Sequence, residues 1–155
     1  MKIQISTISS NYDETTGISK TVIMTDLGSF EGFAKLHPDD KPYESRFAGC
    51  RYAEERAVMK YAKMKIKVIN AQLEVLKNIS NELRNKKYYK ENNGTRLLEK
   101  NIYLLEDDKK YLKDVVTSLT NRLKTEFIER DKLLKEREEK KQSNKWLLCF
   151  LDWRW

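Results

Sequence analysis

The sequence is poor in the residues that build metal centres and tight catalytic loops. Its 155 residues include two cysteines, one histidine, five glycines and two prolines. The two cysteines, Cys50 and Cys149, lie far apart and have no metal-ligand spacing. A chain with few cysteines and many lysines is typical of a cytoplasmic protein whose thiols stay reduced, and this is the location that we expect.

Long apolar runs are also missing. No run approaches the roughly 18 residues that a membrane-spanning helix needs. The first residues, Met1–Ser6, lack the apolar core of a signal peptide. The sequence therefore predicts a soluble protein without a membrane span.

Recognisable catalytic motifs are absent as well. We find no phosphate-binding loop, dinucleotide fingerprint, nucleophile elbow or zinc motif. His37 lies beside Asp39 and Asp40, a set that could bind a metal or transfer a proton. There is no second histidine, however, and paired aspartates before a helix more often complement its dipole. We therefore expect no enzyme, no cofactor and no metal site.

Charge, in contrast, is abundant and unevenly placed. Charged residues make up 35% of the chain and the net charge is +7. Residues 1–50 carry 5 Lys and Arg against 7 Asp and Glu, whereas residues 51–155 carry 26 against 17. The basic character of the second part suits nucleic acid phosphates, an anionic membrane surface or an acidic protein, or else simply a solvated helix surface.

The N-terminal part has the alternation and the β-branched residues of strands. Residues 2–9, 19–25 and 29–36 are predicted strands, and a polar stretch from Ser9 to Gly17 separates the first two. The short connections favour an antiparallel meander. Three strands need a covering layer, so we expect the next helix to pack on them.

The remainder has helical periodicity, with one clear interruption at residues 92–95. From Phe47, the predicted sheet-facing positions are Phe47, Cys50, Ala53, Ala57, Tyr61 and Ala62. Later apolar residues form a coiled-coil seam, first at Ile66, Ile69, Leu73, Leu76 and Leu83, then at Leu98, Ile102, Leu105, Leu112, Val116, Leu119 and Leu123. Asn92, Asn93 and Gly94 predict a helix end, and Thr95 a new helix cap.

Together these patterns predict an α+β fold: a small N-terminal three-stranded antiparallel sheet packed on a helix, followed by a long antiparallel helical (coiled-coil) hairpin. We divide the chain into a β-rich module at residues 1–50, the αα-hairpin at 51–141 and a tryptophan-rich segment at 142–155. The two helical arms are similar in length, so the hairpin would bring the C-terminal segment back beside the sheet.

Two basic clusters are candidate contact sites for a partner or for phosphates. The first contains Lys60, Lys63 and Lys67, with Lys65 between them, and the spacing of the three places them on one helix face. The second, near the predicted hairpin turn, contains Arg84, Lys86, Lys87, Tyr88, Tyr89 and Lys90. Cations that alternate with tyrosines can hold phosphates while the rings stack on bases. Alternatively, the tyrosines close the hairpin end over the seam.

The C-terminal segment holds every tryptophan of the chain. Its large apolar residues are Trp146, Phe150, Trp153 and Trp155. Exposed, they would form a patch of the kind that marks an interface, such as a homodimer contact. Packing on the β-rich module and an interfacial membrane anchor are the alternatives.

Residues 32–40, GFAKLHPDD, and residues 47–57, FAGCRYAEERA, resemble a strand–turn–helix segment of small uncharacterised proteins from Gram-positive bacteria and their phages. Some of those have a double-stranded-RNA-binding-like β-β-β-α module, and the resemblance covers about residues 19–60. It implies a phage or mobile-element accessory protein. It does not imply RNA binding, because Glu44, Glu54 and Glu55 lie among the arginines of the matching helix.

We therefore expect a non-enzymatic accessory protein that acts by stoichiometric binding to a protein or nucleoprotein partner. One example would be an anti-defence inhibitor of a host nuclease. If a phage encodes the protein, we expect it in the host cytoplasm. A direct nucleic-acid-binding protein that uses the basic hairpin is the first alternative. A self-assembling structural coiled coil is the second.

Overall fold

The computed structural model describes residues 3–35, 46–85 and 93–152, with side chains as far as Gln142. The chain divides into two compact units, Met1–Leu119 and Thr120–Trp155. The first unit contains a sheet, a covering helix and the start of a second helix. The second unit is the continuation of that second helix.

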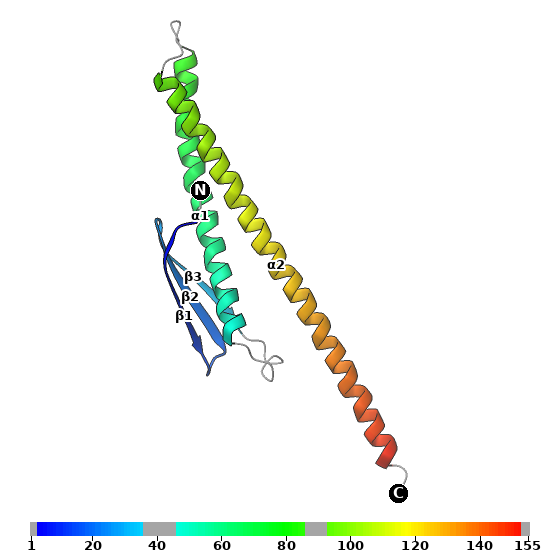
Figure 1. The fold of residues 1–155 in the computed structure, drawn as a ribbon. Coiled ribbons are helices and arrows are strands. Elements are labelled where there is room, and N and C mark those ends of the chain that lie inside the picture. Colours follow the sequence, from blue (N-terminus) through cyan, green and yellow to red (C-terminus); the bar gives the residue numbers. More distant parts are fainter. Residues whose placement is uncertain (1–2, 36–45, 86–92, 153–155) are drawn as a thin grey trace. The chain divides into compact units, whose positions relative to one another are not determined.

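The sheet is the predicted antiparallel meander. Its strands are β1 (Ile5–Asp13), β2 (Ile18–Thr25) and β3 (Gly28–Lys35), in the order β1-β2-β3 (Figure 1). Strand β2 pairs antiparallel with β1 on one side and with β3 on the other. The α+β fold with a sheet packed on a helix is thus confirmed.

Strand β1 extends farther than the alternation predicted, because its polar residues up to Asp13 also pair with β2. The connection shrinks to residues 14–17, where the Asp13 carboxylate accepts hydrogen bonds from the hydroxyls of Thr15 at 2.6 Å and Thr16 at 2.7 Å. Those bonds, that of Thr15 first, lower the pKa of Asp13 to about 2. Gly17 closes the turn with a φ of 65° and donates its N–H to the Asp13 carbonyl at 2.8 Å. The hairpin turn therefore forms from local hydrogen bonds.

Helix α1 (Arg46–Arg84) covers one face of the sheet. Ala53, Ala57 and Tyr61 of α1 are buried, as predicted, and Tyr61 and Ala57 pack with Ile23 of β2. The helix approaches so closely that a Cβ on Gly32 of β3 would lie 1.8 Å from the Ala53 carbonyl oxygen. Small residues on both elements are what permit this distance.

The prediction that Phe47 faces the sheet is wrong, since its side chain is 83% exposed. Gly49 already lies against Ser19, the second residue of β2. Phe47 is two residues nearer the start of the helix. At about 100° per residue it is about 200° around the helix from Gly49, so its side chain is directed away from the sheet.

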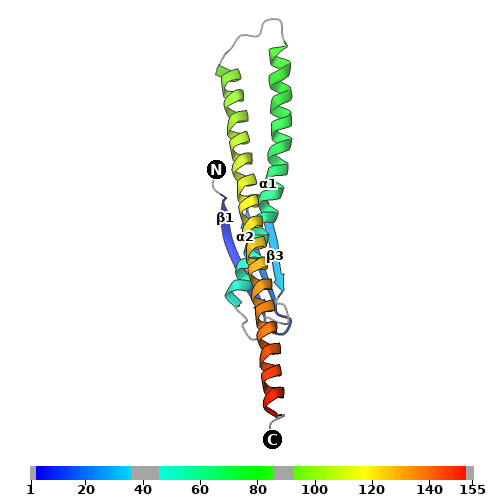
Figure 2. The same ribbon diagram turned by 90° about the vertical axis from the view of Figure 1, so that its right-hand side faces the viewer.

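Within the first unit, the beginning of α2 (Asn93–Asp152) runs antiparallel to α1 (Figure 2). Ala62, Ile69 and Leu73 of α1 form one buried cluster with Leu112 of α2. The half-buried residues Ile66, Ile102, Leu105 and Val116 pack against that cluster. The predicted seam is thus confirmed from Ile66 to Leu73 and from Ile102 to Val116. Ala62, which was predicted to face the sheet, belongs instead to this cluster with α2.

The ends of the two helices differ from the prediction. Helix α1 ends at Arg84, well before residue 92, and residues 86–92 lie outside the described part. The last seam position predicted on this arm, Leu83, lies in the final turn of α1. Thr95 does not cap α2, because the helix starts at Asn93 and Thr95 is buried two residues inside it.

In the second unit, α2 runs from Thr120 to Asp152, so the backbone of residues 142–152 is helical. Leu123 is buried, whereas Ile128 and Leu133 are exposed. The side chains of Trp146 and Phe150, and all of Trp153 and Trp155, lie outside the described residues. The expected return of this segment to the sheet, like its role as an interface, stays a prediction.

Candidate interaction surface on the first helix

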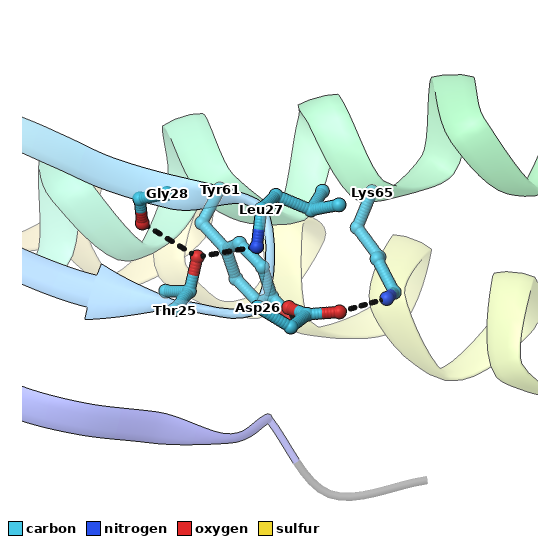
Figure 3. A network of polar contacts seen from close by, with 6 residues as sticks. All are labelled: Thr25, Asp26, Leu27, Gly28, Tyr61 and Lys65. Carbon is cyan, nitrogen blue, oxygen red and sulfur yellow. Dashed lines mark hydrogen bonds and ion pairs between the residues drawn. The ribbon is translucent and has the colours of Figure 1, made fainter.

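A polar network fastens α1 to the turn between β2 and β3 (Figure 3). Tyr61 of α1 donates its hydroxyl proton to the Asp26 carboxylate at 2.9 Å, and Lys65, one turn on, forms an ion pair with the same carboxylate. Thr25 closes the turn, because its hydroxyl donates to the Gly28 carbonyl at 2.9 Å. One carboxylate thus links a strand turn to two successive turns of the helix.

The network shifts the pKa values of both acidic groups. The Lys65 ammonium holds the pKa of Asp26 below its ordinary value against the opposing effect of burial, and the Tyr61 hydroxyl adds to that lowering. Burial, together with the Asp26 carboxylate, raises the pKa of Tyr61 to about 12. Lys65 therefore has a structural role in the β2–β3 turn and does not extend the predicted lysine cluster.

Two cations of α1 reach the open edge of β3. Arg56 Nη1 donates to the Phe33 carbonyl at 2.5 Å, and Lys60 Nζ donates to the Glu31 carbonyl at 2.7 Å. An edge strand presents carbonyl groups that can recruit another strand. By occupying two of them, Arg56 and Lys60 protect this edge and bring positive charge to it.

The ring of Phe33 lies among these cations. It is 43% exposed, with Lys20 Nζ 5.5 Å and Lys60 Nζ 5.9 Å from its centroid. Lys20 also pairs with Glu31 at 2.7 Å. An exposed aromatic ring with ammonium groups nearby can pack against a flat ligand or a partner side chain.

We define the basic stripe as Arg56, Lys60, Lys63 and Lys67. Their spacing of four, three and four residues places them along one side of α1 over about 16 Å. Lys63 and Lys67 are exposed. The structure thus keeps the predicted residues Lys60, Lys63 and Lys67 together and adds Arg56.

Arg56, Lys20 and Phe33 were not predicted as site residues. The helical spacing of the lysines could have indicated Arg56. Strand alternation could have placed Phe33 on the opposite face from Ala34, which is buried. That Lys20 and Phe33 lie beside α1 follows from the position of the helix over β3.

Of the second predicted cluster, the structure describes Arg84 alone. Its guanidinium pairs with Glu99 of α2 at 2.7 Å. About two helical turns earlier, Lys77 pairs with Glu106 at 2.6 Å. Both are exposed ion pairs across the helices. Lys86, Lys87, Tyr88, Tyr89 and Lys90 lie outside the described residues, so their role stays a prediction.

In the described residues, no three His, Cys, Asp or Glu side chains gather in a way that could hold a metal ion. His37, Asp39 and Asp40 lie outside that part of the chain. None of the described helices combines the length and the apolar character needed to cross a membrane.

No protein-family model, no curated protein and no solved structure matches the chain. The resemblance to a double-stranded-RNA-binding-like module stays a prediction. The chemistry of the surface is therefore what indicates a function.

Proposed function

We propose that this protein acts by stoichiometric binding, without catalysis, and that its basic stripe docks on an acidic surface of a protein partner. The observation that supports this most directly is the stripe itself. Lys63 and Lys67 are exposed, and Arg56 and Lys60 continue their line to the edge of β3.

The limits of the stripe favour a protein over a long polyanion. Farther along the same side of α1 come Asn70 and Glu74, and the next cations, Lys77 and Arg84, pair with acidic residues of α2. The basic surface is therefore a short patch. Rim charges of this kind contribute mainly to association rate and to the choice of partner.

The test is site-specific photo-crosslinking in the cells that carry the gene. Met64 is exposed beside the stripe, so a photoreactive residue in its place reports contacts there. We expect one discrete adduct, which disappears when Lys63→Glu and Lys67→Glu are introduced together, because two like charges then face the acidic partner.

The control pair is Lys110→Glu with Lys113→Glu, which changes the charge equally at exposed positions of α2. It should leave the adduct in place. Absence of any adduct at position 64, or equal loss with both pairs, would contradict the proposal.

Direct nucleic-acid binding is a second candidate, and the exposed Phe33 ring between Lys20 and Lys60 favours it. A base could stack on the ring while the cations of the stripe hold phosphates. Binding of a 30-nucleotide single strand would then weaken steeply with salt, with a slope of about −0.7 per phosphate contact. Phe33→Ala should weaken it, while Phe47→Ala, a change of another exposed ring, should not. No gel shift at 50 mM salt would exclude this candidate.

A further inference from the structure

The two sides of the helix pair in the first unit differ in chemistry. On one side the cleft between α1 and α2 is lined by charged residues, including the ion pairs Lys77–Glu106 and Arg84–Glu99. On the other side is an apolar groove of about 680 Å³. Its lining contains no charged residue: Ala71, Gln72, Val75, Leu76, Asn101, Leu104 and Leu105.

Large apolar side chains continue the groove along both helices. Val75 is 58% exposed and Leu104 is 48% exposed, and Ile79, Leu97 and Tyr111 are exposed as well. Leu97, Leu104 and Tyr111 are seven residues apart, which keeps them on one line of α2. This is the pattern of a helix face that packs against another helical layer.

From this asymmetry we propose that the apolar groove is a homodimer interface, in which a second copy of the chain packs groove to groove and completes a four-helix layer. A two-fold axis places the same apolar face on both sides and covers both grooves at once. Because the lining is uncharged, two copies of the same face bring no like charges together in the groove.

The available area agrees with a modest dimer. The face from Leu97 to Tyr111 is about 22 Å long and two helices are about 20 Å wide, which gives about 440 Å² per copy. The roughly 900 Å² of the pair falls in the range of weak, reversible interfaces. Asp108, half-buried between Leu104 and Tyr111 and engaged in an interaction of its own, limits the apolar area. We therefore expect a dissociation constant of roughly 1–100 μM.

Sedimentation equilibrium of the full chain between about 1 and 200 μM tests the proposal. The wild type should pass from monomer to dimer over this range. Leu104→Glu should weaken the dimer at least about 100-fold, because each copy then places a carboxylate in an apolar contact. Val75→Glu, a change on α1, should weaken the dimer similarly, so the test does not depend on a single variant being folded. Circular dichroism checks that both variants keep their helicity.

Tyr103→Glu is the matched control, since Tyr103 is the neighbour of Leu104, is 69% exposed and lines the charged cleft. It should leave the dimer unchanged, and so should the pair Lys63→Glu with Lys67→Glu, which separates this interface from the basic stripe. A monomer at 200 μM, or an oligomer that is insensitive to both Leu104→Glu and Val75→Glu, would overturn the proposal.

Discussion

A methyl group at position 32 has no room between β3 and α1, which makes Gly32→Ala a sharp test of how the helix is docked. The new Cβ would lie 1.8 Å from the Ala53 carbonyl oxygen and 2.6 Å from the Ala57 nitrogen. Both atoms belong to the helix backbone, so no side chain can rotate away. Restoring an ordinary contact of 3.4 Å requires the helix to move by about 1.6 Å.

A gap of that size removes most of the dispersion contact between the facing residues of α1 and the sheet. We expect a loss of about 3 kcal/mol in the free energy of unfolding, which is a large part of the 5–15 kcal/mol of an ordinary domain. Urea denaturation followed by circular dichroism measures it. With an m-value of about 2 kcal/mol/M, the midpoint should fall by about 1.5 M.

Gly28→Ala is the control, because a Cβ there meets nothing within 4 Å. Its only cost in stability is the strain of placing an alanine at a φ of 105°. We expect about 1–2 kcal/mol for that strain. If Gly32→Ala costs no more than Gly28→Ala, the close approach of the helix to β3 is wrong.

Three further predictions concern the polar contacts. Tyr61→Phe removes the hydrogen bond to Asp26 and should lower the free energy of unfolding by about 1–2 kcal/mol, measured by urea denaturation. In the wild type, absorbance should show one tyrosine that titrates near pH 12. The stabilisation by the Tyr61 hydroxyl is present below pH 10 and should be lost as the pH rises to about 12. The Asp13 carboxylate has a pKa of about 2, so it stabilises the turn fully at pH values above its ordinary pKa of 3.8 and loses this effect as the pH falls to about 2. NMR should show that the turn contacts persist at pH 3 and weaken below pH 2. A midpoint near pH 3.8 would refute the contacts. Lys77→Ala breaks an exposed ion pair with Glu106 and should change stability by less than about 1 kcal/mol; a loss above 2 kcal/mol would mean that the pair is far better shielded from water than its exposure indicates.

The sequence predicted the features that depend on local periodicity. The alternation of β2 and β3 and the three- and four-residue spacing of the seam follow from which side chains must be buried, so the α+β fold was predictable. Thr95 was misplaced because Asn93, Gly94 and Thr95 each have the character of a helix boundary. The burial of Thr95 depends on tertiary packing that no local pattern contains.

The candidate site was predictable only in part, for the same reason. Helical spacing separates Lys65 from Lys60, Lys63 and Lys67, but it does not say what each lysine contacts. The rotation of α1 over the sheet directs Lys65 to Asp26 and Lys60 to the Glu31 carbonyl. Phe33 gains its cationic neighbours from the same docking geometry. Such assignments require knowledge of which strand edge lies beside the helix.

The most direct test of stoichiometric binding through the basic stripe is the association rate with the partner captured at position 64, measured by stopped flow at two salt concentrations. We predict saturation at an equimolar ratio and an association rate that falls about tenfold or more between 50 and 300 mM salt. The pair Lys63→Glu with Lys67→Glu should reduce the low-salt rate similarly. Turnover of the partner at substoichiometric protein, or a rate that neither salt nor the charge reversal changes, would contradict the account.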